Sequence, residues 1–166
     1  MLLIGNLVAL VGSLLMVSIG FIKDKKKILT VQCLQFGVLA AANLLLGAYA
    51  GAVSNGVSIV RNLAFFKVEA TTPLKVFFVV LQLGLTLAGG VPAPIELLPI
   101  LSTVIYTCSL DMKSIFRFKF VLILTQSLWV VYDFYYQNYA AFVFDLLTVS
   151  AHIFSVIQLK RDGKEA

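Results

Sequence analysis

Long apolar stretches follow one another along almost the whole chain, and short polar or glycine-rich segments separate them. A helix needs about 20 apolar residues to cross the hydrocarbon core of a bilayer, so we predict one crossing for each stretch. Residues 28–66 contain a single charge and are too long for one helix, and we divide them where Gly47 and Gly51 permit a tight reversal. The predicted fold is all-α, with seven membrane-spanning helices at residues 3–22, 28–47, 50–67, 73–90, 94–110, 116–136 and 139–159.

The composition favours a membrane protein over a soluble one. The chain of 166 residues is 60% hydrophobic and 13% charged, with a mean hydropathy of +0.98, whereas soluble domains are about half apolar and about a quarter charged. Residues 1–22 contain no basic residue ahead of their apolar run and are longer than the core of a signal peptide, so we expect them to remain as the first helix. The lipid bilayer is therefore the first predicted partner.

Basic residues gather at alternate connections between the predicted helices. All but Arg61 fall in four patches, whereas the connections at 47–51, 89–94 and 137–138 carry no basic residue. Because basic connections stay in the cytoplasm, we predict the N-terminus outside and the C-terminus in the cytoplasm. Anionic lipid accounts for the net charge of +5, so nucleic acid is not an expected partner. The patches are Lys23 with Lys25–Lys27, Lys67 with Lys75, Lys113 with Arg117 and Lys119, and Lys160 with Arg161 and Lys164.

The chain repeats itself sparsely at an offset of 90 residues, which places Asn55 on Asp145 and Asn62 on His152. Two three-helix units keep the same orientation only if an odd number of helices joins them, and the predicted span at 73–90 supplies one. We therefore predict a parallel-repeat plan of three, one and three helices. Its parts are a first unit at 1–67, a linker helix at 68–93, a second unit at 94–160 and a cytoplasmic tail at 161–166.

Several short motifs carry a resemblance to a known family. They are Lys23-Asp24-Lys25-Lys26-Lys27, Gln32, Leu46-Gly47-Ala48 with Gly51-Ala52, Asn55 followed by Arg61-Asn62, and Trp129 close to Tyr132. In these motifs the chain resembles the YgjV-like bacterial inner-membrane proteins, which group with the SWEET and PQ-loop (MtN3-like) transporters. The resemblance implies the inner membrane and the same helix plan, and it names no substrate. SWEET-type transporters carry hinge prolines on the first and second helices of each half, whereas here only Pro99 lies in such a helix, so a SWEET-like rocking motion is not implied.

Polar residues inside the predicted spans are the candidate binding residues. A charged side chain at the bilayer centre costs about 3 kcal/mol on insertion scales, so it usually faces a cavity or a partner. Asp145 lies about 9 Å into the last span, and its repeat mate is Asn55. His152 and Asn62 lie seven residues further along the same helix faces. We predict that these four side chains line one axial cavity, with interhelical hydrogen bonding as the alternative that the sequence leaves open.

Arg61 and Trp129 are two further candidates. The Arg61 guanidinium either snorkels to the cytoplasmic headgroups or pairs with Asp145 or with an anionic group of a substrate. Trp129 lies deeper than an aromatic belt at the membrane surface requires, and its indole is suited to stack on a sugar or a heteroaromatic ring. Both belong to the predicted substrate site.

Other polar residues near or within the spans have simpler explanations. Asp133 and Glu96 are expected at the outer rim, where solvated carboxylates require no function. Interhelical hydrogen bonding is the expected role of Gln35, Asn43 and Gln126.

The sequence contains no arrangement of residues typical of catalysis or metal binding. It has one histidine, two isolated cysteines, no G-x-S-x-G, no HExxH and no phosphate loop. We therefore expect no enzyme, no metal and no cofactor. The predicted function is a SWEET-like carrier of a small polar metabolite, such as a sugar, a nucleoside or an amino-acid-like molecule, either facilitative or proton-coupled. A non-transporting membrane scaffold or assembly partner is the alternative, and a homo-oligomer stays open in both cases.

Overall fold

The computed structural model describes residues 1–19, 25–68, 71–88, 93–110, 112 and 114–161, and within these ranges it contains helices and turns but no strand. Each observed helix agrees with a predicted span to within a few residues, so the prediction of seven helices is confirmed. The elements are α1 (Leu2–Ile19), α2 (Lys25–Leu45), α3 (Tyr49–Phe65), α4 (Thr72–Ala88), the short 3-10 helix η1 (Pro94–Glu96), α5 (Leu97–Cys108), α6 (Ile115–Tyr135) and α7 (Tyr139–Arg161).

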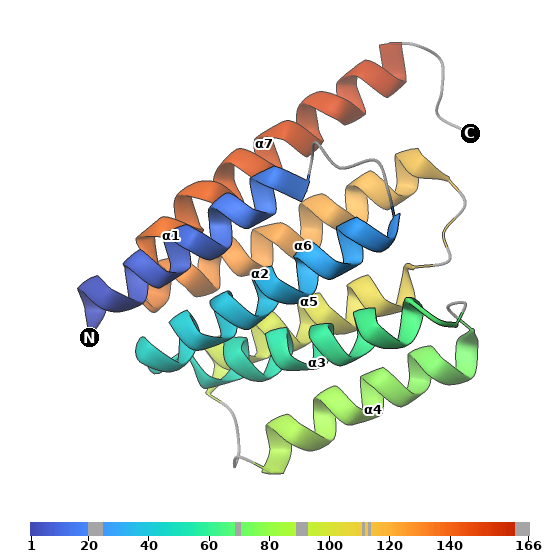
Figure 1. Ribbon diagram of the computed structural model, residues 1–166. Helices are drawn as coiled ribbons and strands as arrows, with labels where there is room; N and C mark the ends of the chain where they lie inside the picture. The colour runs from blue at the N-terminus through green and yellow to red at the C-terminus, as the bar shows by residue number, and fades with distance from the viewer. Residues whose placement is uncertain (20–24, 69–70, 89–92, 111, 113, 162–166) are drawn as a thin grey trace.

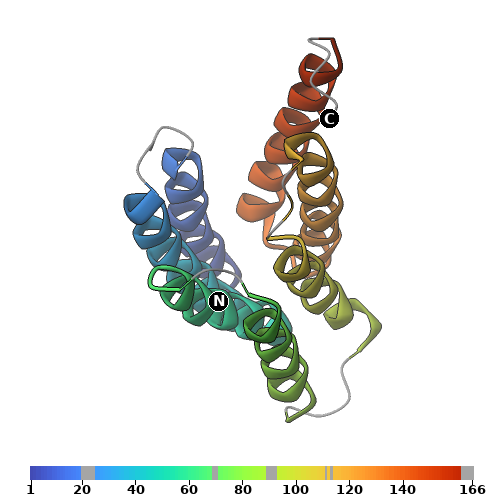
Figure 2. The same cartoon turned by 90° about the vertical axis from the view of Figure 1, so that its right-hand side faces the viewer.

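The helices pack in two groups (Figures 1 and 2). In one group α2 packs between α1 and α3, and in the other α6 packs between α5 and α7. The groups meet where α1 packs against α7 and where α3 packs against α5, while α4 lies against α3 and α5. Figure 2 shows the groups diverging toward the end that carries the C-terminus. The described parts of α2 and α6 do not pack against each other, so side chains of both groups can face a common interior.

The two tight turns inside these groups have the same backbone structure. Gly47 between α2 and α3 has a φ of 75°, and Gln137 between α6 and α7 has a φ of 56°. In each turn this residue's amide donates to the carbonyl three residues back, at 3.2 Å, and the next amide donates to the carbonyl five residues back, at 2.8 or 2.9 Å. This is the Schellman pattern that ends many helices. The predicted reversal therefore occurs at Gly47, whereas Gly51 lies in the first turn of α3.

Polar and apolar side chains are distributed in the reverse of the arrangement in a water-soluble protein. Large apolar side chains such as Leu7, Val80 and Phe154 are exposed, at 55%, 62% and 62%. The buried apolar residues are mostly alanines, whereas many of the buried residues carry amide, hydroxyl or charged groups. An apolar exterior around a polar interior suits a bilayer, because lipid instead of water surrounds the helices.

Helix length and hydropathy together single out one of the described helices as a membrane span. Of the described helices, α7 is both long and apolar enough to span a membrane by these two criteria, and its apolar stretch is largely unburied. Shorter apolar helical stretches lie at Leu2–Ser18, Thr30–Leu45, Thr72–Ala88 and Pro94–Cys108.

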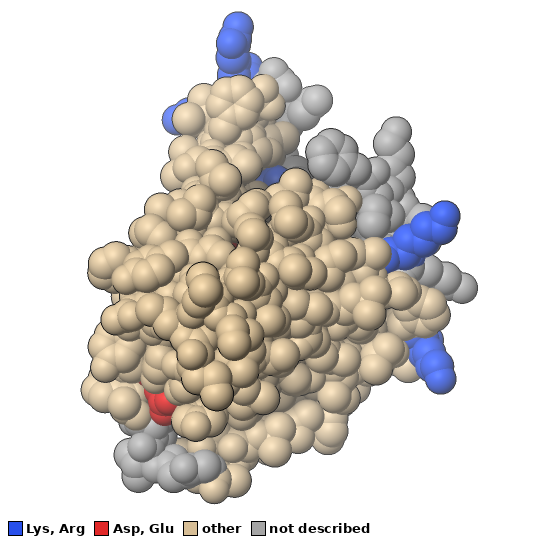
Figure 3. All heavy atoms as spheres, turned by 60° about the vertical axis from the view of Figure 1, so that its left-hand side comes forward, with Lys and Arg blue, Asp and Glu red and all other residues tan. Residues whose placement is uncertain are grey.

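Most of the described basic side chains lie near the ends of helices on one side of the bundle. Figure 3 shows Lys and Arg side chains toward one end of a face, an acidic side chain toward the other, and a broad uncharged surface between them. Lys75, near the start of α4, and Arg61, inside α3, are buried. The Lys75 Nζ donates to the Cys108 carbonyl at 3.3 Å. A cation at this position complements the negative end of the α5 dipole.

Candidate functional site

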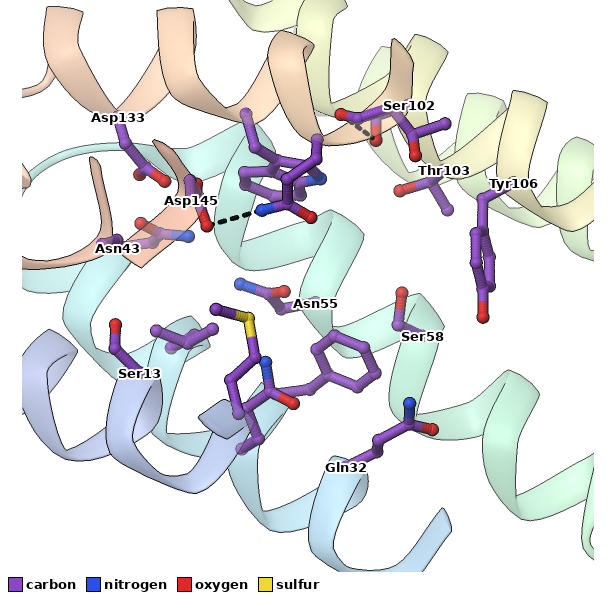
Figure 4. A pocket seen from close by; sticks show the side chains of 18 of the residues that line it. Ser13, Gln32, Asn43, Asn55, Ser58, Ser102, Thr103, Tyr106, Asp133 and Asp145 are labelled. Atoms are coloured by element: carbon purple, nitrogen blue, oxygen red, sulfur yellow. Dashed lines mark hydrogen bonds between the residues drawn. The ribbon is translucent and has the colours of Figure 1, made fainter. Parts of the chain in front are cut away.

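A cavity of about 240 Å³ lies between the two helix groups. Figure 4 shows polar side chains from several helices around it. The wall is formed by α1, α2, α3, α5, α6 and α7, and α4 contributes none of the lining residues. The polar lining residues are Ser13, Gln32, Gln35, Asn43, Asn55, Ser58, Arg61, Ser102, Thr103, Tyr106, Thr125, Gln126, Trp129, Asp133, Asn138 and Asp145.

Two carboxyl groups lie together at one end of this cavity (Figure 4). Asp145 on α7 and Asp133 on α6 are 6% and 3% exposed, and their carboxyl groups are close enough to interact with each other. Gln126 donates to Asp145, and Asn138 Nδ2 donates to Asp133 Oδ1 at 2.9 Å. Two carboxyl groups this close together repel each other when both are ionised, so this end of the cavity favours a cation beside them.

The expected position of Asp133 at a solvated outer rim is therefore wrong. Asp133 lies on the inward face of α6, where Asn138 and Asp145 replace water as its partners. Glu96 is half-buried in η1 and accepts a hydrogen bond from the Tyr136 hydroxyl at 3.2 Å. Glu96 is not among the residues that line the cavity.

Contacts between the two groups close to the turns hold this end of the molecule together. The Gly51 amide donates to the Tyr132 hydroxyl at 2.8 Å, which satisfies one of the free amides at the start of α3. Tyr132 is completely buried. Asn6 of α1 donates to the Gln137 carbonyl at 2.9 Å and accepts from the Ala140 amide at 3.1 Å. Both contacts join residues of the first group to residues of the second.

Arg61 is buried and lies away from the carboxyl pair. Its side chain is 3% exposed, so the snorkelling alternative is wrong. Its Nη1 donates to Thr107 Oγ1 at 3.3 Å, its Nη2 donates to Asn62 Oδ1 at 3.5 Å, and its guanidinium carbon lies 4.8 Å from the centre of the Tyr106 ring. Its Nε has no hydrogen-bond partner. These contacts hold the guanidinium in place between α3 and α5 without neutralising its charge.

Asn55 and Trp129 line the cavity as the sequence predicted. Asn55 is 4% exposed and lies between the carboxyl pair and Tyr106 in Figure 4. The Trp129 indole packs edge-on against the Tyr132 ring, with centroids 5.7 Å apart. Tyr132 therefore fixes one side of the indole, and the indole also faces the cavity.

Asn62 and His152 are not among the residues that line this cavity. Asn62 is buried and donates to Gln32 Oε1 at 3.0 Å, which joins α3 to α2. His152 is half-buried, and its Nδ1 lies 3.5 Å from Lys119 Nζ on α6. Asn55 and Asn62, like Asp145 and His152, are seven residues apart, which is about 10 Å along a helix. Two residues on the same helix face can therefore lie at depths too different for one cavity.

The lining also includes residues for which the sequence indicated only a structural role or no role. Asn43 precedes the α2–α3 turn and Asp133 precedes the α6–α7 turn, again 90 residues apart, so the repeat offset could have identified Asp133 as an interior residue. Asn43 Oδ1 and Asn138 Oδ1 are buried without a partner, as is Arg61 Nε. All three residues line the cavity, where a polar molecule can supply the missing partners.

The Imp-YgjV family model, described as a bacterial inner membrane protein, matches residues 3–163. No curated protein and no solved structure matches the chain.

Proposed function

Because the chain belongs to the Imp-YgjV family of bacterial inner membrane proteins, we propose that it is a carrier that moves a small polar metabolite across that membrane. The observation that carries this proposal is the polar cavity between two helix groups whose exterior is apolar. Polar side chains inside a membrane are costly, and they usually mark the path of a substrate or an ion. A scaffold needs its polar residues only as pairs between helices, as in the Asn62–Gln32 contact.

A duplicated architecture supports the carrier proposal. In the proposed plan, α1–α3 and α5–α7 are parallel repeats and α4 is the linker. A two-fold rotation that relates the repeats would place α1 on α5 and α3 on α7. The same rotation would place the α1–α7 contact on the α5–α3 contact, so the two contacts between the groups are equivalent under it. The matching turns at Gly47 and Gln137, 90 residues apart, follow the same relation. Parallel repeats of this kind place a transport path along the axis between the halves.

The two repeats contribute equivalent polar residues to this axis. Asn55 corresponds to Asp145, and Asn43 corresponds to Asp133, each at an offset of 90. All four side chains are buried and line the cavity. The first repeat thus supplies two amides where the second supplies two carboxyl groups.

Substitution of Asn55 tests the proposed function. In proteoliposomes, Asn55→Ala should reduce uptake of the transported metabolite by about tenfold or more per folded molecule, because it removes a hydrogen-bonding group from the cavity wall. Gln82→Ala is the matched control, since it removes a buried amide of α4 that does not line the cavity. It should reduce folded yield more than uptake per folded molecule. Equal uptake by wild type and Asn55→Ala would contradict the assignment, and absence of saturable uptake of any small polar metabolite by the wild type would favour the scaffold.

We further propose that the basic end of the bundle faces the cytoplasm, with the N-terminus outside. In a chain without Cys33 and Cys108, Gly90→Cys should react with a membrane-impermeant thiol reagent added outside intact cells, whereas Lys25→Cys should react only after the membrane is permeabilised. The reverse pattern would refute this orientation.

A further inference from the structure

The cavity contains buried charges of both signs, and they do not neutralise each other directly. Arg61 is the basic residue among those that line it, and Asp133 and Asp145 are the acidic ones. No carboxylate forms a salt bridge with Arg61 within the described ranges of the chain. Its polar partners are a hydroxyl and an amide oxygen.

The positive and negative groups occupy opposite ends of the cavity. Figure 4 shows Asp133 and Asp145 at one end and Tyr106 at the other, with Asn55 and Ser58 between them. The Arg61 guanidinium lies over the Tyr106 ring and therefore at the second end. A buried charge is stable when an opposite charge or hydrogen-bonding groups compensate it, so each end of the cavity favours a ligand group of the opposite charge.

The space between the charges is short. Arg61 lies six residues beyond Asn55, about 9 Å along the axis of α3, and the proposed two-fold relation puts Asp145 at the depth of Asn55. A volume of about 240 Å³ lies below the roughly 300–1,000 Å³ of pockets that hold drug-sized ligands. The ligand must therefore be compact, with its two charges close together.

From these observations we propose that the substrate is a small zwitterion of the amino-acid type. Its ammonium group lies at the Asp133–Asp145 pair, and its carboxylate lies at Arg61, where the unpaired Nε is an additional donor. A guanidinium binds a carboxylate through two parallel hydrogen bonds more specifically than a point charge does. Amides and hydroxyls between the two ends are suited to a small polar or uncharged side chain. This inference rests on the proposed carrier function and selects one class among its substrates.

The inference can be tested by ligand-dependent thermal stability of the full-length wild-type protein in detergent, since a ligand that binds only the folded state raises its apparent stability. The probes are glycine, L-alanine, L-serine, L-threonine and L-proline, the methyl ester and N-acetyl derivative of each, and D-glucose. The ester lacks the negative charge, and the acetyl derivative lacks the positive one. At least one free amino acid should bind about tenfold or more tightly than both of its derivatives. The ester loses the charged hydrogen bonds of the carboxylate, and the acetyl derivative loses those of the ammonium group. Binding of none of the free amino acids, or equal binding of a derivative, would overturn the inference.

Two substitutions assign the charges to the two ends of the site. Arg61→Gln should weaken binding of the free amino acid by about tenfold or more but leave binding of its methyl ester unchanged, and Arg61→Lys should retain part of the preference. Asp145→Asn should weaken binding of the free amino acid but leave binding of the N-acetyl derivative unchanged. If a variant weakened binding of the free amino acid and of the compared derivative equally, the effect would be a general structural one and would contradict the assignment. If a variant does not fold, the wild-type comparison still decides between the outcomes.

Failure of this inference can be distinguished from failure of the carrier proposal. Binding and uptake of D-glucose without a preference for zwitterions would refute the substrate class and support a carrier. Absence of binding and uptake for any small polar metabolite would refute both.

Discussion

Asp145→Asn is expected to reduce uptake by about thirtyfold or more, because loss of a buried charge that pairs with a ligand costs about 2–5 kcal/mol. Asparagine has nearly the shape of aspartate, and its amide oxygen can still accept from Gln126. The substitution leaves Asp133 as the only carboxyl group of the pair, so a ligand cation can no longer lie between two carboxyl groups. Uptake in proteoliposomes, normalised to folded protein, measures the effect.

The same experiment decides whether transport is facilitative or proton-coupled. If the carboxyl pair carries a proton with the substrate, an imposed pH gradient should accelerate wild-type uptake and have no effect on Asp145→Asn. Glu96→Gln is the matched control, since Glu96 is a half-buried carboxylate outside the cavity lining, and it should behave like the wild type. Identical wild-type rates with and without the gradient would identify a facilitative carrier. Full activity of Asp145→Asn would exclude the carboxyl pair from transport.

Gly51→Ala should destabilise the folded protein by about 1–3 kcal/mol, the usual cost of overpacking a tight interior. A Cβ atom at this position would lie 2.7 Å from Asn43 Nδ2 and 2.8 Å from Tyr132 Cε1. The ring of Tyr132 cannot move aside easily, because it is completely buried and its hydroxyl is hydrogen-bonded to the Gly51 amide. Thermal unfolding in detergent should show a lower midpoint for the variant than for the wild type.

Gly56→Ala provides the control on the same helix. A Cβ atom at Gly56 meets nothing within 4 Å, and alanine is favoured over glycine in a helix by up to about 1 kcal/mol. This variant should be as stable as the wild type or slightly more stable. Equal midpoints for Gly51→Ala and Gly56→Ala would show that the Gly51–Tyr132 contact is unimportant for stability.

Much of the fold could be predicted because hydrophobic length and turn chemistry are local properties of the sequence. The division of residues 28–66 at Gly47 is correct because a positive φ ends a helix there. The equivalent turn at Gln137 was located by its polarity and by the absence of basic residues, although glutamine gives no signal for a positive φ. The placement of Gly51 in the turn was wrong because its role is close packing, which depends on Tyr132 from a distant helix.

The candidate site was predicted less completely, because a cavity depends on how helices meet. Asn55, Asp145, Arg61 and Trp129 line the cavity, as their depth in the spans suggested. The helical period placed His152 on the same face of α7 as Asp145. It gave no information on how far the cavity extends along that helix.

Asp133 was misplaced for a related reason. It is close to the end of α6 in sequence, but the packing of α7 buries it beside Asp145. Only the comparison with Asn43 in the first half could have indicated its position before the structure was known.

The central claim is that the cavity between the two helix groups binds a small polar metabolite. Trp129 is the only tryptophan of the chain and lines this cavity, so its fluorescence reports on the site without a label. The decisive measurement is titration of the purified protein with a library of small polar metabolites. We expect at least one compound to cause a saturable change in Trp129 emission that Asn55→Ala weakens by about tenfold or more. No saturable change with any compound, or a change that Asn55→Ala leaves unaltered, would contradict the claim.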